Sequence, residues 1–362
     1  MKEWLVLCPK PYFEIEKRRF QDEKAVQVYS MTPRNIARAK KHLDNQKPVL
    51  CEYMLEKKLL EANNLECLYF LLDENPITTK QMLEKIDNRI HLLYMDQVYA
   101  KVAEERFGRD CHFIEPDLKC LMPRRNLRAQ QKRVLLVGNY LNPEDGEAKL
   151  REHSPELFYP IVKKVTQKSK MEYQRRLDEI VAEVFAEEKL KYTSEIGNEF
   201  IDAFQNEIET YHERKDRHEL AYRLIAEGVH VNVIGEHWDV FRKKLPEELQ
   251  ENLTIVCPVL VREIIVEAMK DMEVVVVIDR SRKYGMSMWT KLAKELGGEI
   301  VVPQTEYTEK VAHKDKQVYL YNPNRLSGSV RQIKKILDSD KILGCNTHGE
   351  GESFLVSWMK TI

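Results

Sequence analysis

The chain has 362 residues, enough for two domains of ordinary size. Hydrophobic residues make up 43% and charged residues 32%, and 58 Lys and Arg against 59 Asp and Glu give a net charge of -1. This balance argues against a general nucleic-acid or membrane-surface binder, which usually carries a basic excess.

Neither a membrane span nor a secretion signal is expected. The apolar runs are shorter than the roughly 20 residues of a membrane helix, and MKEWLVLCPKPYFEIEKRR carries charges too early for a signal peptide. The seven cysteines are scattered without a CxxC pair, which argues against a disulfide framework or a zinc site. We therefore expect a cytoplasmic protein without a metal, in which Cys8, Cys51, Cys67 and Cys257 are core residues.

Short apolar runs alternate with helical patterns in the first third of the chain. The segment TPRNIARAKKHLDN, for example, carries Ile36, Ala37 and Leu43 on a helical stripe. Several of the runs are apolar on both faces, as in a parallel sheet covered by helices on both sides. The expected strands are 3–8, 25–30, 49–54, 66–72, 90–95 and 112–115. This alternation predicts an α/β domain over residues 1–121.

A polar stretch, MPRRNLRAQQKR (122–133), follows this domain and is interpreted as a linker. An alternative is a basic rim that faces a phosphate-bearing ligand, because the stretch holds four arginines and one lysine: Arg124, Arg125, Arg128, Arg133 and Lys132.

The second half repeats the α/β pattern, so the fold class is α/β with two Rossmann-like domains. The second domain is expected at 134–345, with a helical insertion at about 146–227 and a tail at 346–362. The charged faces of the insertion are expected to be exposed and to carry no chemistry. The expected strands are 134–137, 230–235, 253–257, 274–279, 299–303 and 317–322.

Ligands of such sheets bind at the carboxyl ends of the strands. Three strand-end loops of the second half combine glycine with basic or aromatic residues, which suits a phosphate and a base. There is no GxGxxG and no GxxxxGK[ST], so neither a dinucleotide oxidoreductase nor a P-loop enzyme is favoured. The three loops are 138–140, 235–238 and 280–285, and Trp238 or Tyr140 is expected to stack on a base or sugar.

Six segments, in order and spacing, resemble the bacterial glycosyltransferase-like proteins of the GT-B fold that include the spore-maturation CgeB-like group. They are YFLLDENP, HLLYMDQVYAKVAEERFG, VLLVGNYLNPED, GVHVNVIGEHWDVF, ENLTIVCPV and EAMKDMEVVVVI. The resemblance implies transfer from a nucleotide sugar that binds mainly to the second domain, onto an acceptor bound by the first, with no metal or other cofactor required. The matching donor-site positions are Gly138, Asn139, Tyr140, Gly235, Glu236 and Trp238.

The chain departs from the family after residue 279. A His-Glu-Arg-like segment is expected there, and the sequence instead reads YGMSMW at 284–289. Glu115-Pro116-Asp117 likewise stands where a histidine-glycine turn is usual, whereas Thr305-Glu306 resembles the family's next loop. The expected donor-binding residues near these positions are therefore Arg280, Arg282, Lys283, Gly285 and Glu306.

Three hypotheses remain open at this point. The chain is an active transferase whose basic loop holds the diphosphate, an inactive GT-B protein that binds a protein partner, or a different α/β enzyme or sensor. No general base is obvious. Asp73 and Asp96 follow buried strands and fit helix caps or turns better than catalysis, and His237 and His348 are weaker candidates.

Overall fold

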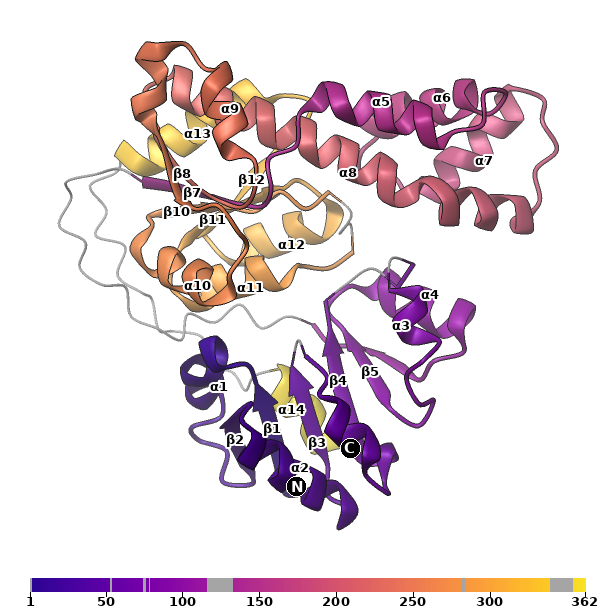
Figure 1. Cartoon of the computed structure of the whole chain (residues 1–362), viewed down its shortest axis with the longest axis vertical. Coiled ribbons are helices and arrows are strands. Elements are labelled where there is room, and N and C mark those ends of the chain that lie inside the picture. The colour runs from indigo at the N-terminus through magenta and orange to yellow at the C-terminus, as the bar shows by residue number, and fades with distance from the viewer. Residues whose placement is uncertain are drawn as a thin grey trace. The chain divides into compact units, whose positions relative to one another are not determined.

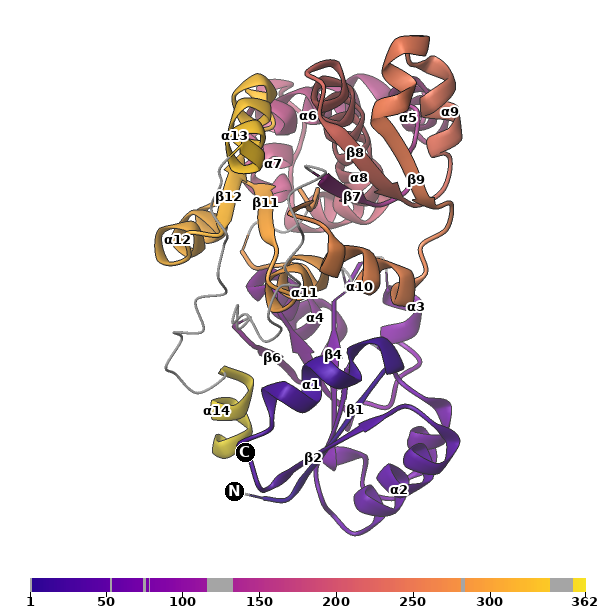
Figure 2. The same ribbon diagram turned by 90° about the vertical axis from the view of Figure 1, so that its left-hand side faces the viewer.

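The computed structural model describes residues 2–52, 54–73, 76–77, 79–115, 133–280, 284–338 and 354–362. These residues form two compact units (Figures 1 and 2). The first unit draws its described residues from Met1–Pro123, Tyr284–Gly297 and Leu343–Ile362, and the second from Arg124–Lys283 and Gly298–Ile342. No helix in these ranges combines the length and the apolar character that a membrane span requires.

The first unit is built on a parallel six-stranded sheet in the order β2-β1-β3-β4-β5-β6. Its strands alternate their side chains, so Leu5 and Leu7 pack with Ile36 and Leu43 of α2 on one face. Its strands are β1 (Trp4–Cys8), β2 (Val26–Ser30), β3 (Val49–Glu52), β4 (Leu68–Leu72), β5 (His91–Tyr94) and β6 (Cys111–Phe113). Its helices are α1 (Phe13–Arg19), α2 (Pro33–Asp44), α3 (Lys80–Leu83), α4 (Gln97–Phe107), α11 (Met288–Glu295) and α14 (Phe354–Thr361).

The second unit is also built on a parallel six-stranded sheet, in the order β12-β11-β10-β7-β8-β9. Counted from β7, this is the 3-2-1-4-5-6 order of a Rossmann fold. Its strands are β7 (Arg133–Val137), β8 (His230–Ile234), β9 (Leu253–Cys257), β10 (Val274–Val276), β11 (Glu299–Pro303) and β12 (Val318–Tyr321). The helices beside this sheet are α9 (Trp238–Lys244), α10 (Arg262–Asp271), α12 (Glu306–Lys314) and α13 (Leu326–Asp338). Two parallel sheets with flanking helices confirm the predicted α/β class with two Rossmann-like domains.

A helical arm extends from the second unit between β7 and β8 (Figure 1). Its helices α5, α6 and α7 pack along α8, which runs for 33 residues and packs its C-terminal part against β7 and β8. The arm consists of α5 (Pro143–His153), α6 (Tyr159–Met171), α7 (Leu177–Glu187) and α8 (Ser194–Ala226). The insertion expected at 146–227 is therefore helical throughout, apart from its connecting turns.

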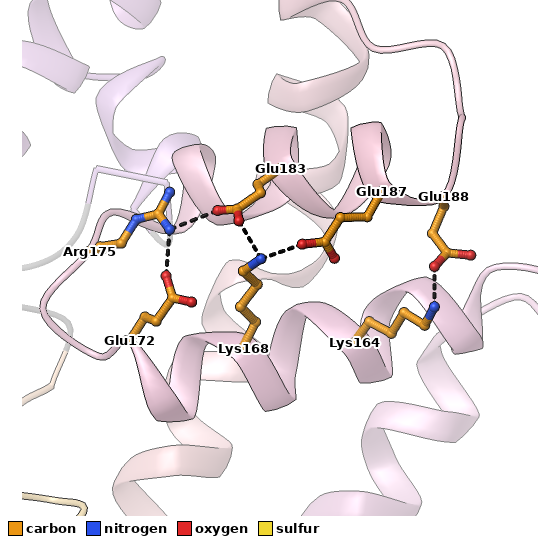
Figure 3. A network of polar contacts seen from close by, with 7 residues as sticks. All are labelled: Lys164, Lys168, Glu172, Arg175, Glu183, Glu187 and Glu188. Carbon is orange, nitrogen blue, oxygen red and sulfur yellow. Dashed lines mark hydrogen bonds and ion pairs between the residues drawn. The ribbon is translucent and has the colours of Figure 1, made fainter.

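Ion pairs between exposed and half-buried side chains join α6 to α7 in this arm (Figure 3). Lys168 lies 2.5 Å from both Glu183 and Glu187, and Arg175 lies 2.7 Å from Glu183. Two further pairs, Lys164 with Glu188 and Arg175 with Glu172, continue the row. A single exposed pair contributes at most about 1 kcal/mol, and buried apolar residues of α6, α7 and α8 add hydrophobic packing to the arm.

The segment 284–297 belongs to the first unit, although the sequence analysis assigned it to the second domain. The amide of Met288 donates to Asp73 at 2.9 Å, and the amide of Met286 donates to the carbonyl of Met95 at 3.3 Å. Arg19 of α1 pairs with Glu295 of α11. Buried polar contacts thus outweigh chain continuity in deciding where this segment packs. The tail contributes α14, whose Trp358 ring lies 5.9 Å from that of Trp4.

Candidate site at the carboxyl ends of β7 and β10

The candidate site lies where the strand order of the second sheet reverses. From β7 the chain adds β8 and β9 on one side, and then β10, β11 and β12 on the other. In doubly wound folds the loops after the two strands that flank such a reversal leave the sheet in opposite directions, and ligands bind in the crevice between them. The residues that follow these two strands are therefore the first place to look for a site.

The loop after β7 is locked to the loop after β8 by backbone and side-chain hydrogen bonds. The amide of Glu236 donates to Asn139 Oδ1 at 2.9 Å, and the amide of Tyr140 donates to the carbonyl of Glu236 at 2.8 Å. A Cβ on Gly235 would stand 2.6 Å from the carbonyl carbon of Gly138. Glycine is needed at 235 because two backbones meet there. Gly138, Asn139 and Gly235 therefore make contacts between the two loops.

Tyr140 and Trp238, which we expected to stack on a base or sugar, lie in the core of the second unit. Each has 1% of its surface exposed, and their ring centroids are 5.5 Å apart. Trp238 Nε1 donates to the carbonyl of Gly138 at 2.9 Å, and the Tyr140 hydroxyl lies 3.1 Å from His218 Nδ1. Burial raises the pKa of Tyr140 to about 12. Because neither ring presents a face to solvent, the stacking role expected for them is corrected to core packing.

Two guanidinium groups lie close to the residues that follow these two strands. Arg217 of α8 donates from Nη1 to the carbonyl of Asn139 at 2.9 Å, and its Nη2 lies 2.8 Å from the point where a Cβ of residue 138 would stand. Arg280, four residues after β10, is 6% exposed. Its Nη1 lies 3.5 Å from Asp216 Oδ1, and its guanidinium carbon lies 5.7 Å from the ring centroid of Tyr173. Arg217 and Arg280 thus place positive charge at the ends of both strands that flank the reversal.

Two carboxyl groups of α8 lie beside these guanidinium groups. Glu213 Oε1 accepts from the amide of Arg280 at 3.1 Å. Burial, reinforced by the charge of Asp279, raises the pKa of Glu213 to about 8. Burial also raises the pKa of Asp216 to about 6, against the opposing attraction of Arg280. Burial lowers the pKa of Arg217. The cluster therefore takes up protons near neutral pH more readily than isolated carboxylates would.

A small pocket opens beside Arg280, between the arm helices. One wall is polar, because His212 Nε2 lies 2.9 Å from Ser169 Oγ. Its lining residues are Ser169, Tyr173, Leu177, Ile208, Glu209, His212 and Arg280. The pocket thus connects the arm to the arginine cluster within a single unit.

The remaining donor-site predictions fall in different places. Arg282 and Lys283 lie outside the described residues. Gly285 belongs to the first unit, where a Cβ would stand 2.5 Å from the Cα of Asp96, so its expected place in the donor loop of the second unit is corrected to a close backbone contact. Glu236 is exposed, and Glu306 is an exposed residue at the start of α12 that pairs with Lys310 at 2.7 Å.

Three of the four candidate catalytic residues lie in the described part of the chain. Asp96 is the N-cap of α4 and accepts from the amides of Val98 and Tyr99 at 2.9 and 3.1 Å, as the cap interpretation predicts. Asp73 accepts from the amide of Met288. His237 is exposed and holds a left-handed φ of 65° at the start of α9. His348 lies outside the described residues.

The sequence analysis missed the residues of α8, whose charged faces it took to be exposed. His212 and Asp216 are buried, at 4% exposure each. They fall on the four-residue spacing of the apolar stripe, since 200, 204 and 208 precede them and 220 and 224 follow. Polar residues at core-facing positions of an apolar stripe could have indicated buried polar groups in the sequence.

Comparison with known proteins gives distant structural likenesses only. No family model and no curated protein matches the chain. The solved structure of TarM of S. aureus is similar with a TM-score of 0.46 and 12% identity, over 90% of this chain and 58% of TarM. Anabaena HepE, solved in complex with UDP and glucose, is similar with a TM-score of 0.42 and 10% identity, over 99% and 95%. An α,α-trehalose 6-phosphate synthase from Burkholderia multivorans is similar with a TM-score of 0.39 and 10% identity, over 100% and 97%. The chain thus spans less than two thirds of the TarM chain.

Proposed function

We propose that the chain is a glycosyltransferase-like protein that binds a nucleotide-sugar donor at the carboxyl ends of β7 and β10. The observation that carries the proposal is the pair of guanidinium groups, Arg217 and Arg280, at the strand-order reversal of a Rossmann sheet. Arginine binds phosphate oxygens through two parallel N–H donors. A diphosphate at this point would face both side chains, and the resemblance of the strand-end segments to GT-B proteins supports the sugar.

The carboxyl groups give this site a direction of pH dependence. A diphosphate adds negative charge next to Glu213 and Asp216, which disfavours their ionised forms. Their pKa values of about 8 and about 6 place proton uptake in the neutral range. Binding is therefore accompanied by proton uptake, and its affinity falls as the pH rises from about 6 to about 8.

Thermal unfolding with a panel of nucleoside diphosphates and nucleotide sugars tests the proposal. At a ligand concentration of about 100 Kd, binding stabilises the folded protein by about 2.7 kcal/mol. The Arg217→Gln and Arg280→Gln variants are expected to lose the shift. The control Arg223→Gln keeps it, because this arginine lies on the exposed side of α8 and pairs with Glu219.

The outcomes separate the hypotheses. If no compound raises Tm, or if both arginine variants respond like the wild type, the proposed site is refuted. A shift at pH 8 as large as that at pH 6 would refute the role of Glu213 and Asp216. A compound that binds is then tested for hydrolysis and for sugar transfer. Binding without either reaction would favour the inactive GT-B protein over the transferase.

A further inference from the structure

A cluster of two histidines and one aspartate lies at the amino-terminal ends of β5 and β6 in the first unit. His91 is the first residue of β5, Asp110 directly precedes β6, and His112 is in β6. In the parallel pairing His112 stands opposite Leu93, whose side chain shares a sheet face with that of His91. One nitrogen of each imidazole and one carboxylate oxygen all lie within 4.8 Å of one another.

The hydrogen bonding of His91 presents one ring nitrogen to this cluster. His91 Nε2 lies 3.1 Å from the carbonyl oxygen of Glu66. A carbonyl can only accept, so Nε2 carries a proton and donates it. The other nitrogen, Nδ1, points at Asp110 Oδ2. A metal-ligating histidine commonly donates its other ring N–H to a backbone carbonyl, and the Glu66 carbonyl takes that place for His91. Without an ion Nδ1 pairs directly with Asp110, and a bound ion would replace this direct contact.

The imidazole of His112 supplies the third candidate ligand. His112 Nε2 lies 3.6 Å from Asp110 Oδ1, which is longer than a hydrogen bond. Two ligand atoms on one tetrahedral zinc ion, each about 2.1 Å from it, stand roughly 3.4 Å apart. The side chain of Asp110 is 51% exposed, and those of His91 and His112 are 23% and 34% exposed, so solvent can reach a fourth position.

An aromatic ring packs against each of the two histidines. The Tyr69 ring stacks on His91 at 4.7 Å with an interplanar angle of 14°, and the Trp358 ring of α14 lies 5.8 Å from His112. Imidazole and carboxylate ligands suit ions of the zinc type, whereas Mg²⁺ and Ca²⁺ prefer oxygen alone. We propose that His91, Asp110 and His112 bind one divalent ion of the Zn²⁺ class, which ties the edge strand β6 to β5 in the first unit.

Calorimetric titration of the full, tag-free chain with ZnCl₂, after removal of bound metal with EDTA, tests this site. The wild type is expected to bind one equivalent, and Zn²⁺ is expected to raise its Tm. The His91→Gln/His112→Gln double variant is expected to bind at least about 10-fold more weakly. The control His313→Gln changes an exposed histidine of α12 and keeps the wild-type affinity.

A second variant keeps the test decisive if the double variant does not fold. Asp110→Asn changes an exposed side chain that packs in no core and is also expected to weaken Zn²⁺ binding at least about 10-fold. The proposal is overturned if the wild type takes up no Zn²⁺, or if the aspartate and histidine variants bind it as the wild type does. It is equally overturned if binding is lost in Cys67→Ser but kept in the histidine variant. None of these readouts depends on nucleotide binding, so failure here and failure of the proposed function are distinguishable.

Discussion

The buried carboxyl group of Glu52 makes the stability of the first unit depend on pH. Glu52 ends β3, has no exposed surface, and has one oxygen 3.6 Å from Arg19 Nη1. Arg19 is shared, because it also pairs with Glu16 at 2.5 Å and with Glu295 of α11. Replacing Glu52 with glutamine removes the titration while keeping the shape of the side chain.

The size of the effect follows from the pKa. Burial first, and then the nearby charge of Glu16, raises the pKa of Glu52 from 4.5 to about 8. Because the folded-state pKa exceeds the unfolded value, the stabilisation is fully present below about pH 4.5 and is lost as the pH rises towards 8. At about 1.36 kcal/mol for each pH unit in this window, the free energy of unfolding falls by about 3 kcal/mol between pH 4.5 and 7. Glutamine at position 52 has no such loss.

Urea unfolding followed by tryptophan fluorescence at pH 5 and pH 7.5 measures this difference. Three of the four tryptophans, Trp4, Trp289 and Trp358, belong to the first unit. The stability of Glu52→Gln relative to the wild type is expected to increase by about 3 kcal/mol from pH 5 to pH 7.5. The control Glu61→Gln, on an exposed side chain, is expected to change stability by less than about 0.5 kcal/mol at either pH. A relative stability of Glu52→Gln that is the same at both pH values would refute the reasoning.

Two further predictions concern the close backbone contact at Gly285 and the cap that Asp96 forms on α4. Gly285→Ala forces a Cβ against the backbone of Asp96 and is expected to cost about 1–3 kcal/mol in denaturant unfolding, whereas Gly328→Ala meets open space and stays at least as stable as the wild type. Equal stability of the two alanine variants would contradict the close approach. Asp96→Ala removes the cap of α4 and is expected to cost about 1–2 kcal/mol by the same measurement. Asp96→Asn retains an acceptor and should lose less, so an equal loss would argue against the cap.

The sequence predicted the strands well because each is a short, continuous apolar run. All six segments expected in each half overlap an observed strand, for example 3–8 with Trp4–Cys8 and 299–303 with Glu299–Pro303. The ends of the strands were predicted less accurately. The run 274–279 stays apolar through Ile278, but the strand β10 spans only Val274–Val276, because pairing with both neighbours ends there.

The candidate site was harder to predict, since a position after a strand does not say where a side chain points. Tyr140 follows β7 in a loop and Trp238 is the first residue of α9, and both side chains nevertheless turn into the core. Arg217 reaches the same crevice from a helix nearly eighty residues along the chain from Asn139. Periodicity describes one helix at a time, so it identifies a buried charge such as Asp216 only when the polar residue interrupts an apolar stripe.

The assembly of the first unit from three separate chain segments has a consequence for the order of folding. During synthesis the strands β1 to β6 emerge long before α11 and α14. Until then Asp73 lacks the amide of Met288, Arg19 lacks Glu295, and the indole of Trp4 lacks the carbonyl of Met359 that accepts its hydrogen bond at 3.3 Å. Domains near the N-terminus usually fold first on the ribosome. Here the contacts that α11 and α14 make with the sheet of the first unit become available only after most of the second unit has been synthesised.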